Sequence, residues 1–469
     1  MNIGKRFRFF TCAILSAFLF ASVSCAQNAP FASNNPSDSY SDSTDNGGNE
    51  SIDGATALAT PAPAYKLSYN DRKNEDYVAF KQKLELFSAK LASITYDTYD
   101  KEPNFTISPL SVFSALALAV EGADGATRTQ ILNALGVSYA QLQEYYAMLY
   151  NEVTVTHSET ENGEEKLSGE VQLSNSVWMQ EGVLFKQPTL DTLANKYYAY
   201  SYLADFKRNN EGANEALKDF VKKQTHGLID QNFQLSKDTI LALVNTLYLK
   251  DGWLQNGDDL QTAGTYTFTN ADGSTLSTEL LRGLYSSGRA YETDAYSFFY
   301  NTTANGYKVK FILPKDGYSV ADIFTEETLS EVNSVKNFTA ADDEYIYFTR
   351  CIFPEFTAEY DEDMKDLLKE YFSVLNLFDK YTCDFNNLIQ NQEEQFEFVW
   401  CEKVQHVAKL SVDKTGIEGA AATVIQISGS TSAPDMPMLY ADFVVDKAFG
   451  FIVTSPHDIT LFSGVVENL

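Results

Sequence analysis

The chain has 469 residues, of which 64 are acidic and 35 basic, and its formal net charge is −29. Contacts to the phosphates of nucleic acid need clusters of Lys and Arg, so this balance argues against nucleic acid as a partner. Hydrophobic residues make up 44% of the chain, which is enough for one large core or two smaller ones. We therefore expect a large folded part that binds no nucleic acid.

The N-terminus has the features of a bacterial secretory signal. Basic residues precede an apolar run over residues 9–23, which is too short and wrongly flanked for a transmembrane helix. The end of this run is similar to a lipobox, in which the cysteine becomes the lipidated N-terminus. We expect a signal peptide over residues 1–24, export across the inner membrane, and a lipid on Cys25 as the one membrane contact, at the cell envelope or surface. Ordinary cleavage near Ala26 and release into the extracellular space is the alternative.

Residues 25–70 have the composition of a disordered tether. Asn, Ser, Asp, Gly and Pro dominate this stretch, and its few large apolar side chains cannot offset the entropy of ordering. A flexible coil of about 40 residues has a root-mean-square reach of roughly 35 Å. We therefore expect the tether to hold a folded domain, residues 71–469, off a membrane surface.

Hydrophobic periodicity predicts both helices and strands in the folded domain. Helical spacing covers residues 75–96 and 111–135, with Ser108 as the N-cap and Pro109 in the first turn of the second helix. Buried strands are predicted over residues 171–179, 239–249, 345–353, 396–412 and 443–453. Because the helices come largely first and the strands cluster later, the predicted fold class is α+β.

The chain offers little machinery for catalysis or metal binding. Cys351, Cys383 and Cys401 stay in the domain, and their odd number and irregular spacing favour buried free thiols over disulfides or a zinc site. There is no nucleophile-elbow, zinc-protease or phosphate-loop motif, and the four histidines are scattered. We expect no metal and no cofactor, and a hydrolase is the weakest of our interpretations.

A segment near the C-terminus has the chemistry of a strand in a stretch that looks locally like a loop. It contains no proline and consists of Gly416, Ile417, Glu418, Gly419, Ala420, Ala421, Ala422 and Thr423. In a sheet, alternate side chains from Ile417 to Thr423 would face the core, and Glu418 would face water. The segment can be an exposed loop in one state and a strand in another. An ordinary alanine-rich edge strand is the alternative.

Five segments, taken in chain order, resemble the conserved motifs of the serpin family. They cover the start of helix B, strand 3A with Trp253, the strand 6A region, strand 5A with the hinge of the reactive loop, and the closing strands, at residues 104–111, 243–250, 353–356, 406–423, and 443–453 with 461–464. The likeness runs over residues 71–469. It implies an α+β serpin fold, with helices around three mainly antiparallel sheets, an exposed reactive loop and a metastable sheet A.

The resemblance also implies a mechanism. A serpin presents its reactive loop as bait, and after cleavage the loop inserts into sheet A before the acyl-enzyme can hydrolyse, which traps the protease. We therefore expect a monomeric suicide inhibitor of serine proteases. A non-inhibitory binding protein with the serpin fold, or an inhibitor of papain-like cysteine proteases, is the alternative.

Two groups of polar residues are implied by the same resemblance. The shutter, a hydrogen-bonded cluster beneath the strands that must part, would contain Ser108, Ser111, Asn245 and His406. The breach, where the loop enters sheet A, would contain Trp253, Glu355 and Lys414. Lys414 stands where the family usually has glutamate and Glu355 where it usually has a basic residue, so we expect a reversed ion pair.

The usual family spacing also predicts the bond that a protease would cleave. Counting seventeen residues from Lys414 gives the reactive bond Ser430–Thr431. A small residue before the bond suits elastase-like or subtilisin-like serine proteases. Because the loop is longer than in most family members, bonds after Met438 or Tyr440, which suit chymotrypsin-like enzymes, are the alternatives.

Overall fold

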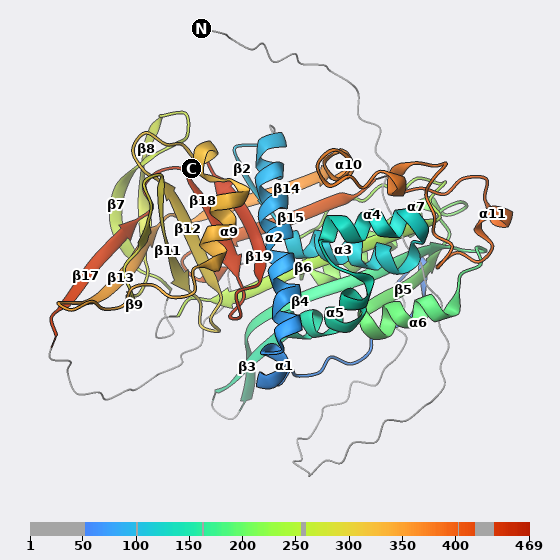
Figure 1. Ribbon diagram of the computed structural model, residues 1–469, viewed down its shortest axis with the longest axis horizontal. Helices are drawn as coiled ribbons and strands as arrows, with labels where there is room; N and C mark the ends of the chain where they lie inside the picture. Colours follow the sequence, from blue (N-terminus) through green and yellow to red (C-terminus); the bar gives the residue numbers. More distant parts are fainter. Residues whose placement is uncertain (1–51, 100–101, 162–163, 255–258, 402, 418–435) are drawn as a thin grey trace, which may run out of the picture.

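The computed structural model describes residues 52–99, 102–161, 164–254, 259–401, 403–417 and 436–469 (Figure 1). The predicted signal peptide, Cys25, the hinge residues from Glu418 to Thr423 and the reactive bond Ser430–Thr431 lie outside the described residues. Among the residues that are described, no helix is long and apolar enough to cross a membrane.

Three sheets and a set of helices make up the described part, which confirms the α+β fold class. The main helices are α2 (Glu75–Thr98), α3 (Pro109–Gly122), α4 (Gly125–Leu135), α5 (Tyr139–Val153), α6 (Gln187–Lys196), α7 (Asn210–Gln224), α9 (Glu326–Ser334) and α10 (Lys365–Phe372). Shorter ones are α1 (Tyr69–Arg72), α8 (Val320–Ile323) and α11 (Gln392–Gln395). As predicted, Ser108 caps α3 through its side chain and Pro109 lies in the first turn.

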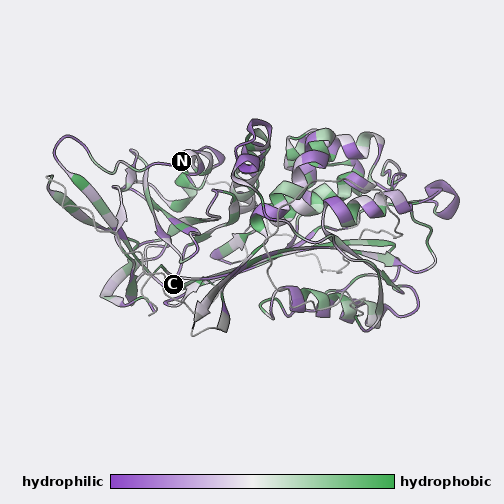
Figure 2. Ribbon diagram, turned by 90° about the horizontal axis from the view of Figure 1, so that it is seen from below, coloured by the Kyte–Doolittle hydropathy of each residue, from purple (hydrophilic) through white to green (hydrophobic). Residues whose placement is uncertain are grey.

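The largest sheet, called sheet A here, has the strand order β1-β5-β4-β6-β16-β15-β14, and β3 also pairs with β4. Its strands are β1 (Ala55–Ala59), β3 (Val155–Glu161), β4 (Glu164–Gln180), β5 (Ala199–Ala204), β6 (Leu241–Gly252), β14 (Phe356–Asp363), β15 (Gln405–Val412) and β16 (Gly416–Ile417). Helices lie on both faces of this long sheet (Figure 2), and α3 and α7 both pack against β6.

Two smaller sheets lie at the other end of the molecule (Figure 1). Sheet B has the order β10-β11-β12-β18-β19-β2, from β2 (Asn104–Ile107), β10 (Tyr291–Glu292), β11 (Tyr296–Thr302), β12 (Lys308–Pro314), β18 (Phe449–Thr454) and β19 (Thr460–Val466). Sheet C has the order β17-β13-β8-β7, with β9 also on β13, from β7 (Thr262–Thr269), β8 (Thr275–Arg282), β9 (Ser286–Ser287), β13 (Ile346–Phe353) and β17 (Met438–Val444).

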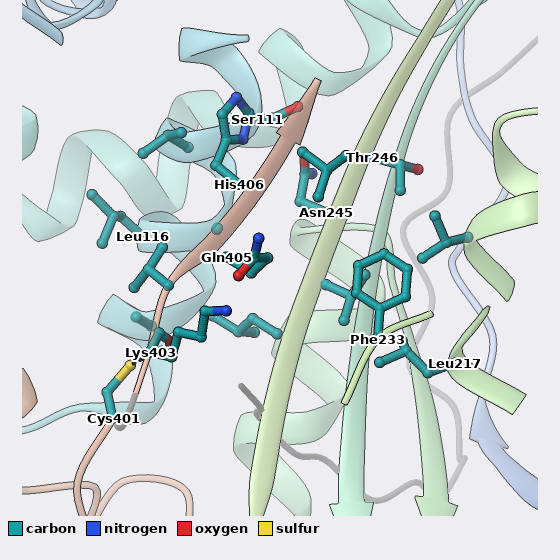
Figure 3. A pocket seen from close by; sticks show the side chains of 18 of the residues that line it. Ser111, Leu116, Leu217, Phe233, Asn245, Thr246, Cys401, Lys403, Gln405 and His406 are labelled. Atoms are coloured by element: carbon teal, nitrogen blue, oxygen red, sulfur yellow. Dashed lines mark hydrogen bonds between the residues drawn. The ribbon is translucent and has the colours of Figure 1, made fainter. Parts of the chain in front are cut away.

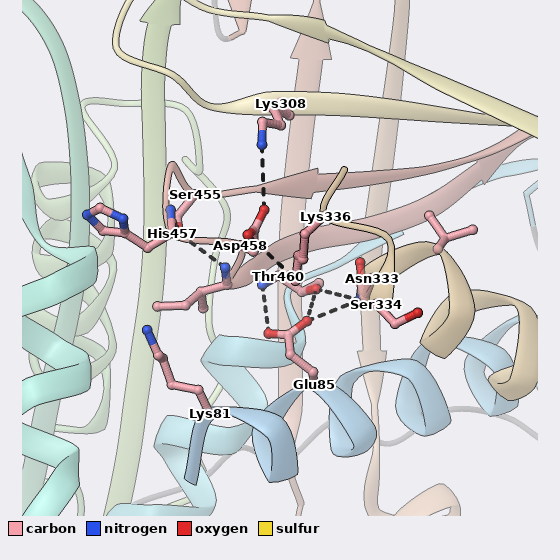
Figure 4. A network of polar contacts seen from close by, with 12 residues as sticks. Lys81, Glu85, Lys308, Asn333, Ser334, Lys336, Ser455, His457, Asp458 and Thr460 are labelled. Carbon is pink, nitrogen blue, oxygen red and sulfur yellow. Dashed lines mark hydrogen bonds and ion pairs between the residues drawn. The ribbon is translucent and has the colours of Figure 1, made fainter. Parts of the chain in front are cut away.

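A buried polar network joins α2 and α9 to sheet B (Figure 4). The Glu85 carboxylate accepts hydrogen bonds from the backbone N–H of Thr460 at 3.0 Å, from its hydroxyl at 2.6 Å, and from Asn333 Nδ2 at 3.0 Å. Burial raises the pKa of Glu85 and lowers the pKa of Lys310, which donates to the same Asn333 side chain, to about 8. The network therefore links α2 directly to β19 of sheet B.

Several predicted boundaries differ from the structure. The helical run 111–135 is two helices, because Asp124 caps a new helix at Gly125. The strand run 443–453 is two strands in different sheets, β17 and β18. Of the run 396–412, only the last part forms β15.

The predicted tether also needs correction, because residues 55–59 within it form β1. This strand pairs antiparallel with β5, and Ala62 N donates to Ala194 O at 3.2 Å just beyond it. A short run of Ala, Thr and Leu has too little apolar surface to order alone, but the open edge of sheet A supplies its backbone partners.

Candidate functional site

Sheet A is divided by a slot between β6 and β15. Only the two residues of β16 lie between these strands: Gly416 pairs with Gly252, and Ile417 pairs with Asp251 on one side and Val412 on the other. Below β16, no ladder joins β6 to β15 within the described residues. We call the space between the two unpaired strand edges the slot. Among the residues that the structure describes, only β16 lies in it, at one end.

The chain enters the slot through a tightly fitted turn. A Cβ at Gly416 would lie 2.2 Å from the carbonyl oxygen of Asp251, so only glycine fits there. Ile417 is fully buried, as the predicted alternation requires. The Trp253 indole donates to the carbonyl oxygen of Asp413 at 2.7 Å, and the Asp413 carboxylate accepts from the backbone N–H of Gly416 at 3.1 Å. These contacts hold the start of the hinge inside the sheet.

Lys414 and Glu355 are neighbours, but the predicted side-chain ion pair between them is wrong. Glu355 Oε1 accepts from the backbone N–H of Lys414 at 2.8 Å, so the carboxylate binds the turn itself. The Lys414 ammonium instead lies 2.6 Å from Asp259 Oδ2, and this hydrogen bond raises the pKa of Lys414. Asp259 lies in a loop beside the turn. The prediction compared only Lys414 with Glu355, so it could not include this residue.

The predicted shutter residues form two groups rather than one hydrogen-bonded cluster. On the α3 side, His406 Nε2 accepts from the backbone N–H of Ser108 at 3.0 Å, and Ser108 Oγ accepts from the N–H of Ser111 at 3.3 Å. Burial lowers the pKa of His406 to about 3, so the ring is neutral and its Nε2 is free to accept. On the other side, Asn245 Nδ2 donates to Asn175 Oδ1 at 2.6 Å.

The two groups meet at a cavity under the slot. Ser111, Asn245 and His406 all line it, and Figure 3 shows Asn245 and Gln405 between β6 and β15. Three buried side-chain oxygens around this cavity, on Asn245, Thr246 and Gln405, have no hydrogen-bond partner among the described residues. Each buried polar atom left unpaired typically costs about 1–3 kcal/mol. The slot is therefore a place where the native fold holds unfavourable free energy.

Two residues of this region were not predicted from sequence. Asn175, on β4, bonds Asn245 and also donates from Nδ2 to the Tyr146 hydroxyl at 3.0 Å. Asp251, beside Ile417, is buried and accepts from Thr303 Oγ1 at 2.5 Å and from Asn305 Nδ2 at 2.8 Å, and burial raises its pKa to about 6. For Asn175, the available signal was an amide side chain within the predicted buried strand 171–179, which calls for a buried partner, whereas Asp251 lies beyond the predicted strand 239–249.

The other predicted residues within the described part of the chain are Met438, Tyr440 and the cysteines. Met438 and Tyr440 lie in β17, which pairs in parallel with β13 along its whole length. The described cysteines Cys351, Cys383 and Cys401 are buried thiols that form no disulfide with one another, as predicted.

Comparison with known proteins shows the family. A family model described as Serpin (serine protease inhibitor) matches residues 82–469, and the chain belongs to the serpin family. Serpin-Z2A of Triticum aestivum is 26% identical over 400 residues, which are 81% of this chain and 94% of that protein. The solved structure of Arabidopsis AtSerpin1 in its native stressed conformation has a TM-score of 0.67 at 20% identity, over 84% of this chain and 98% of that one.

The fold is shared by proteins with different functions. Human thyroxine-binding globulin, solved in complex with thyroxine, has a TM-score of 0.63 at 18% identity, over 84% of this chain and 99% of that one. Most serpins are inhibitors of serine proteases rather than enzymes. The family is therefore established, whereas the particular function depends on this chain's own slot and loop.

Proposed function

We propose that this protein inhibits serine proteases by suicide trapping, through cleavage of the reactive loop and its insertion into the slot of sheet A. The observation that carries the proposal is the slot itself. In the described part of the chain no strand pairs with its two edges, on β6 and β15, below β16, and the start of the hinge already occupies one end. A strand that continued from Ile417 would hydrogen-bond to both edges, which makes insertion downhill once cleavage frees the loop.

The chemistry of the hinge supports insertion. After Ile417, the core-facing positions of a continued strand would be Gly419, Ala421 and Thr423, which are small and uncharged. Residues of this kind can pass into a packed sheet without burying an unpaired charge. The loop is therefore suited to the slot that the sheet leaves open.

The bond Ser430–Thr431 remains our proposed reactive bond, with elastase-like or subtilisin-like proteases as targets. Met438 and Tyr440 belong to a strand that is hydrogen-bonded to β13. A protease binds its substrate in an extended form, so cleavage after either residue would first have to break the ladder between β17 and β13. That placement argues against the two alternative bonds.

The direct test is to incubate the purified domain with pancreatic elastase, subtilisin, chymotrypsin and papain, and to run denaturing gels. We expect a covalent complex with elastase or subtilisin, and sequencing of the released fragment should give cleavage after Ser430. Cleavage without complex would instead indicate a non-inhibitory serpin, and a complex with papain alone would indicate a cysteine protease inhibitor.

Substitutions in the hinge separate insertion from binding. Ala421→Arg would place a charge on the core side of the inserted strand, so we expect the inhibitor to become a cleaved substrate with at least a tenfold loss of complex. The matched control is Ala422→Arg, whose side chain would point to the opposite face. If Ala421→Arg forms complex at the wild-type yield, insertion of this segment is not the mechanism.

We also propose that the protein is exported by residues 1–24 and anchored by a lipid on Cys25. The basic and apolar pattern and the lipobox-like end support this. Full-length protein expressed in a bacterial host should be found in the membrane fraction and take up labelled palmitate. Cys25→Ser should abolish the labelling. Release of wild-type protein without label would show ordinary signal cleavage.

A further inference from the structure

Sheet C carries a group of exposed aromatic side chains that the trapping mechanism does not use. β17 is the edge strand of this sheet, and its residues 438–442 are all exposed. Partners in a parallel ladder share a face, so Met438, Tyr440 and Asp442 lie on the same face as Ile346, Phe348 and Arg350. With Tyr285, which follows β8, the exposed and half-buried side chains of this face form the sheet C patch: Tyr285, Phe348, Arg350, Met438, Tyr440 and Asp442.

The side chains of the patch hold one another in place. The Tyr440 ring stacks on Phe348 with centroids 5.3 Å apart and meets Tyr285 edge-on at 5.0 Å. The Arg350 guanidinium lies 4.6 Å from the centre of the Tyr285 ring and binds Asp442 through two hydrogen bonds, at 2.6 and 3.1 Å. This contact lowers the pKa of Asp442, so the pair stays charged. The patch is therefore ordered before any partner arrives.

Its composition is that of a binding surface. Tyr440 is 55% exposed, and Met438 and Tyr285 are each 40% exposed. Ordered tyrosine, methionine and arginine side chains are enriched at the centres of protein interfaces, because they bury much apolar area at a small loss of conformational freedom. Although the chain has a net charge of −29, the one carboxylate of the patch, on Asp442, is neutralised by Arg350.

The patch lies within reach of a protease that holds the proposed reactive bond. Met438 follows Thr431 by seven residues, which span at most about 25 Å when fully extended. A protease of about 230 residues has a radius of gyration of roughly 17 Å. An enzyme whose active site holds the bond Ser430–Thr431 is therefore close enough to place its own surface against the patch.

We propose that the sheet C patch is a second docking surface for the serine protease that the reactive loop captures, and that it contacts an apolar rim beside the active site of that enzyme. This proposal rests on the proposed function. The patch strengthens the first, non-covalent complex, whereas the slot in sheet A decides what happens after cleavage. The two surfaces therefore predict different kinetic effects.

The test uses the double variant Tyr285→Ser/Tyr440→Thr, in which Thr keeps a residue suited to a strand. With pancreatic elastase and with subtilisin, we expect the association rate constant to fall by about tenfold or more, because clustered aromatic residues carry most of the binding energy of an interface. The number of inhibitor molecules used per trapped enzyme should stay at the wild-type value. Binding to protease whose catalytic serine is replaced by alanine should weaken by the same factor.

The matched control is Tyr69→Thr. Tyr69 is 67% exposed on α1, which lies away from β17 in Figure 1. The Tyr69→Thr variant should leave unchanged both the association rate constant and the number of inhibitor molecules used per trapped enzyme. Thermal melts should show that all variants are folded.

Each outcome separates this proposal from the one on which it rests. If wild type traps protease and the double variant associates at an unchanged rate with both enzymes, the patch proposal is wrong and the inhibitory function stands. If wild type forms no complex, the function itself fails and the patch has no such partner. If wild type sediments as a dimer and the double variant as a monomer, the patch joins two copies of this chain instead.

Discussion

At the residue scale, a buried histidine joins α3 to one strand of the slot. His406 is 6% exposed, and its Nε2 accepts a hydrogen bond from the backbone N–H of Ser108 at 3.0 Å. An acceptor at this position requires a neutral ring, and burial keeps it neutral by lowering the pKa of His406 to about 3. The bond ties the start of α3 to β15, one of the two strands that form the slot.

The first prediction concerns pH. The native protein holds His406 neutral down to about pH 3, whereas the unfolded chain binds a proton below about pH 6.5. Above pH 6.5 the neutral His406 therefore costs the folded state nothing, and the free energy of unfolding is at its full value. Below pH 6.5 the free energy of unfolding falls by about 1.4 kcal/mol for each pH unit. Denaturant unfolding of wild type and His406→Gln between pH 7.5 and 5 should show the flatter pH dependence in the variant. Parallel curves would show that the ring is not held neutral.

The second prediction concerns the turn that enters the slot. The Lys414 ammonium binds Asp259, whereas Glu355 hydrogen-bonds to the backbone of Lys414 and acts on its ammonium only as a more distant charge. A double-mutant cycle of Lys414→Ala with Asp259→Asn should therefore show the larger coupling in thermal stability, and a cycle of Lys414→Ala with Glu355→Gln the smaller one. Exchanging the charges through Lys414→Glu and Glu355→Lys should not restore the wild-type melting temperature. Recovery in that double variant would indicate a direct ion pair.

At the scale of elements, sheet A is completed at one edge and incomplete in its middle. β1 pairs with β5 and protects an edge that would otherwise be open. Gly54, just before β1, has a φ of +87° and lies so close to α7 that a Cβ would meet Gly212 O at 2.5 Å. The described residues before α1, from residue 52 onward, are thus packed against the folded domain.

The third prediction follows from β1. A chain without residues 26–60 should melt at a lower temperature than one without residues 26–50, because only the first loses the strand partner of β5. Each kcal/mol lost lowers the midpoint by about 2–4 °C in domains of 150–250 residues, and we expect a shift of that order. Equal midpoints for the two deletions would mean that β1 adds nothing to the stability of the sheet.

At the scale of the whole molecule, the slot and the loop complement each other. Below β16, no strand of the described residues pairs with the facing edges of β6 and β15, and the reactive loop joins β16 to β17 on a different sheet. The chain is therefore held between two sheets as long as the loop is intact, and cutting it frees a strand of the right chemistry for the slot. The fold would then gain backbone hydrogen bonds along both edges.

The fourth prediction concerns the cleaved protein. Wild type cut within the reactive loop should melt at a temperature higher by about 10 °C or more, because an inserted strand supplies several net-stabilising hydrogen bonds. Cleaved Ala421→Arg should gain much less, since its charge opposes insertion. Scanning calorimetry of intact and cleaved forms makes the comparison. An unchanged midpoint in cleaved wild type would rule out insertion.

Local patterns in the sequence determined the family, the α+β class, the capped start of α3 and the buried face of Ile417. Each of these depends on neighbours along the chain or on a motif a few residues long, which sequence alone records. Only the tertiary structure decided that Lys414 pairs with Asp259, that Asn245 pairs with Asn175, and that β1 lies on the edge of sheet A. These contacts join segments far apart in the chain, and the register of strands and the direction of side chains, which fix them, emerge only when the whole core packs.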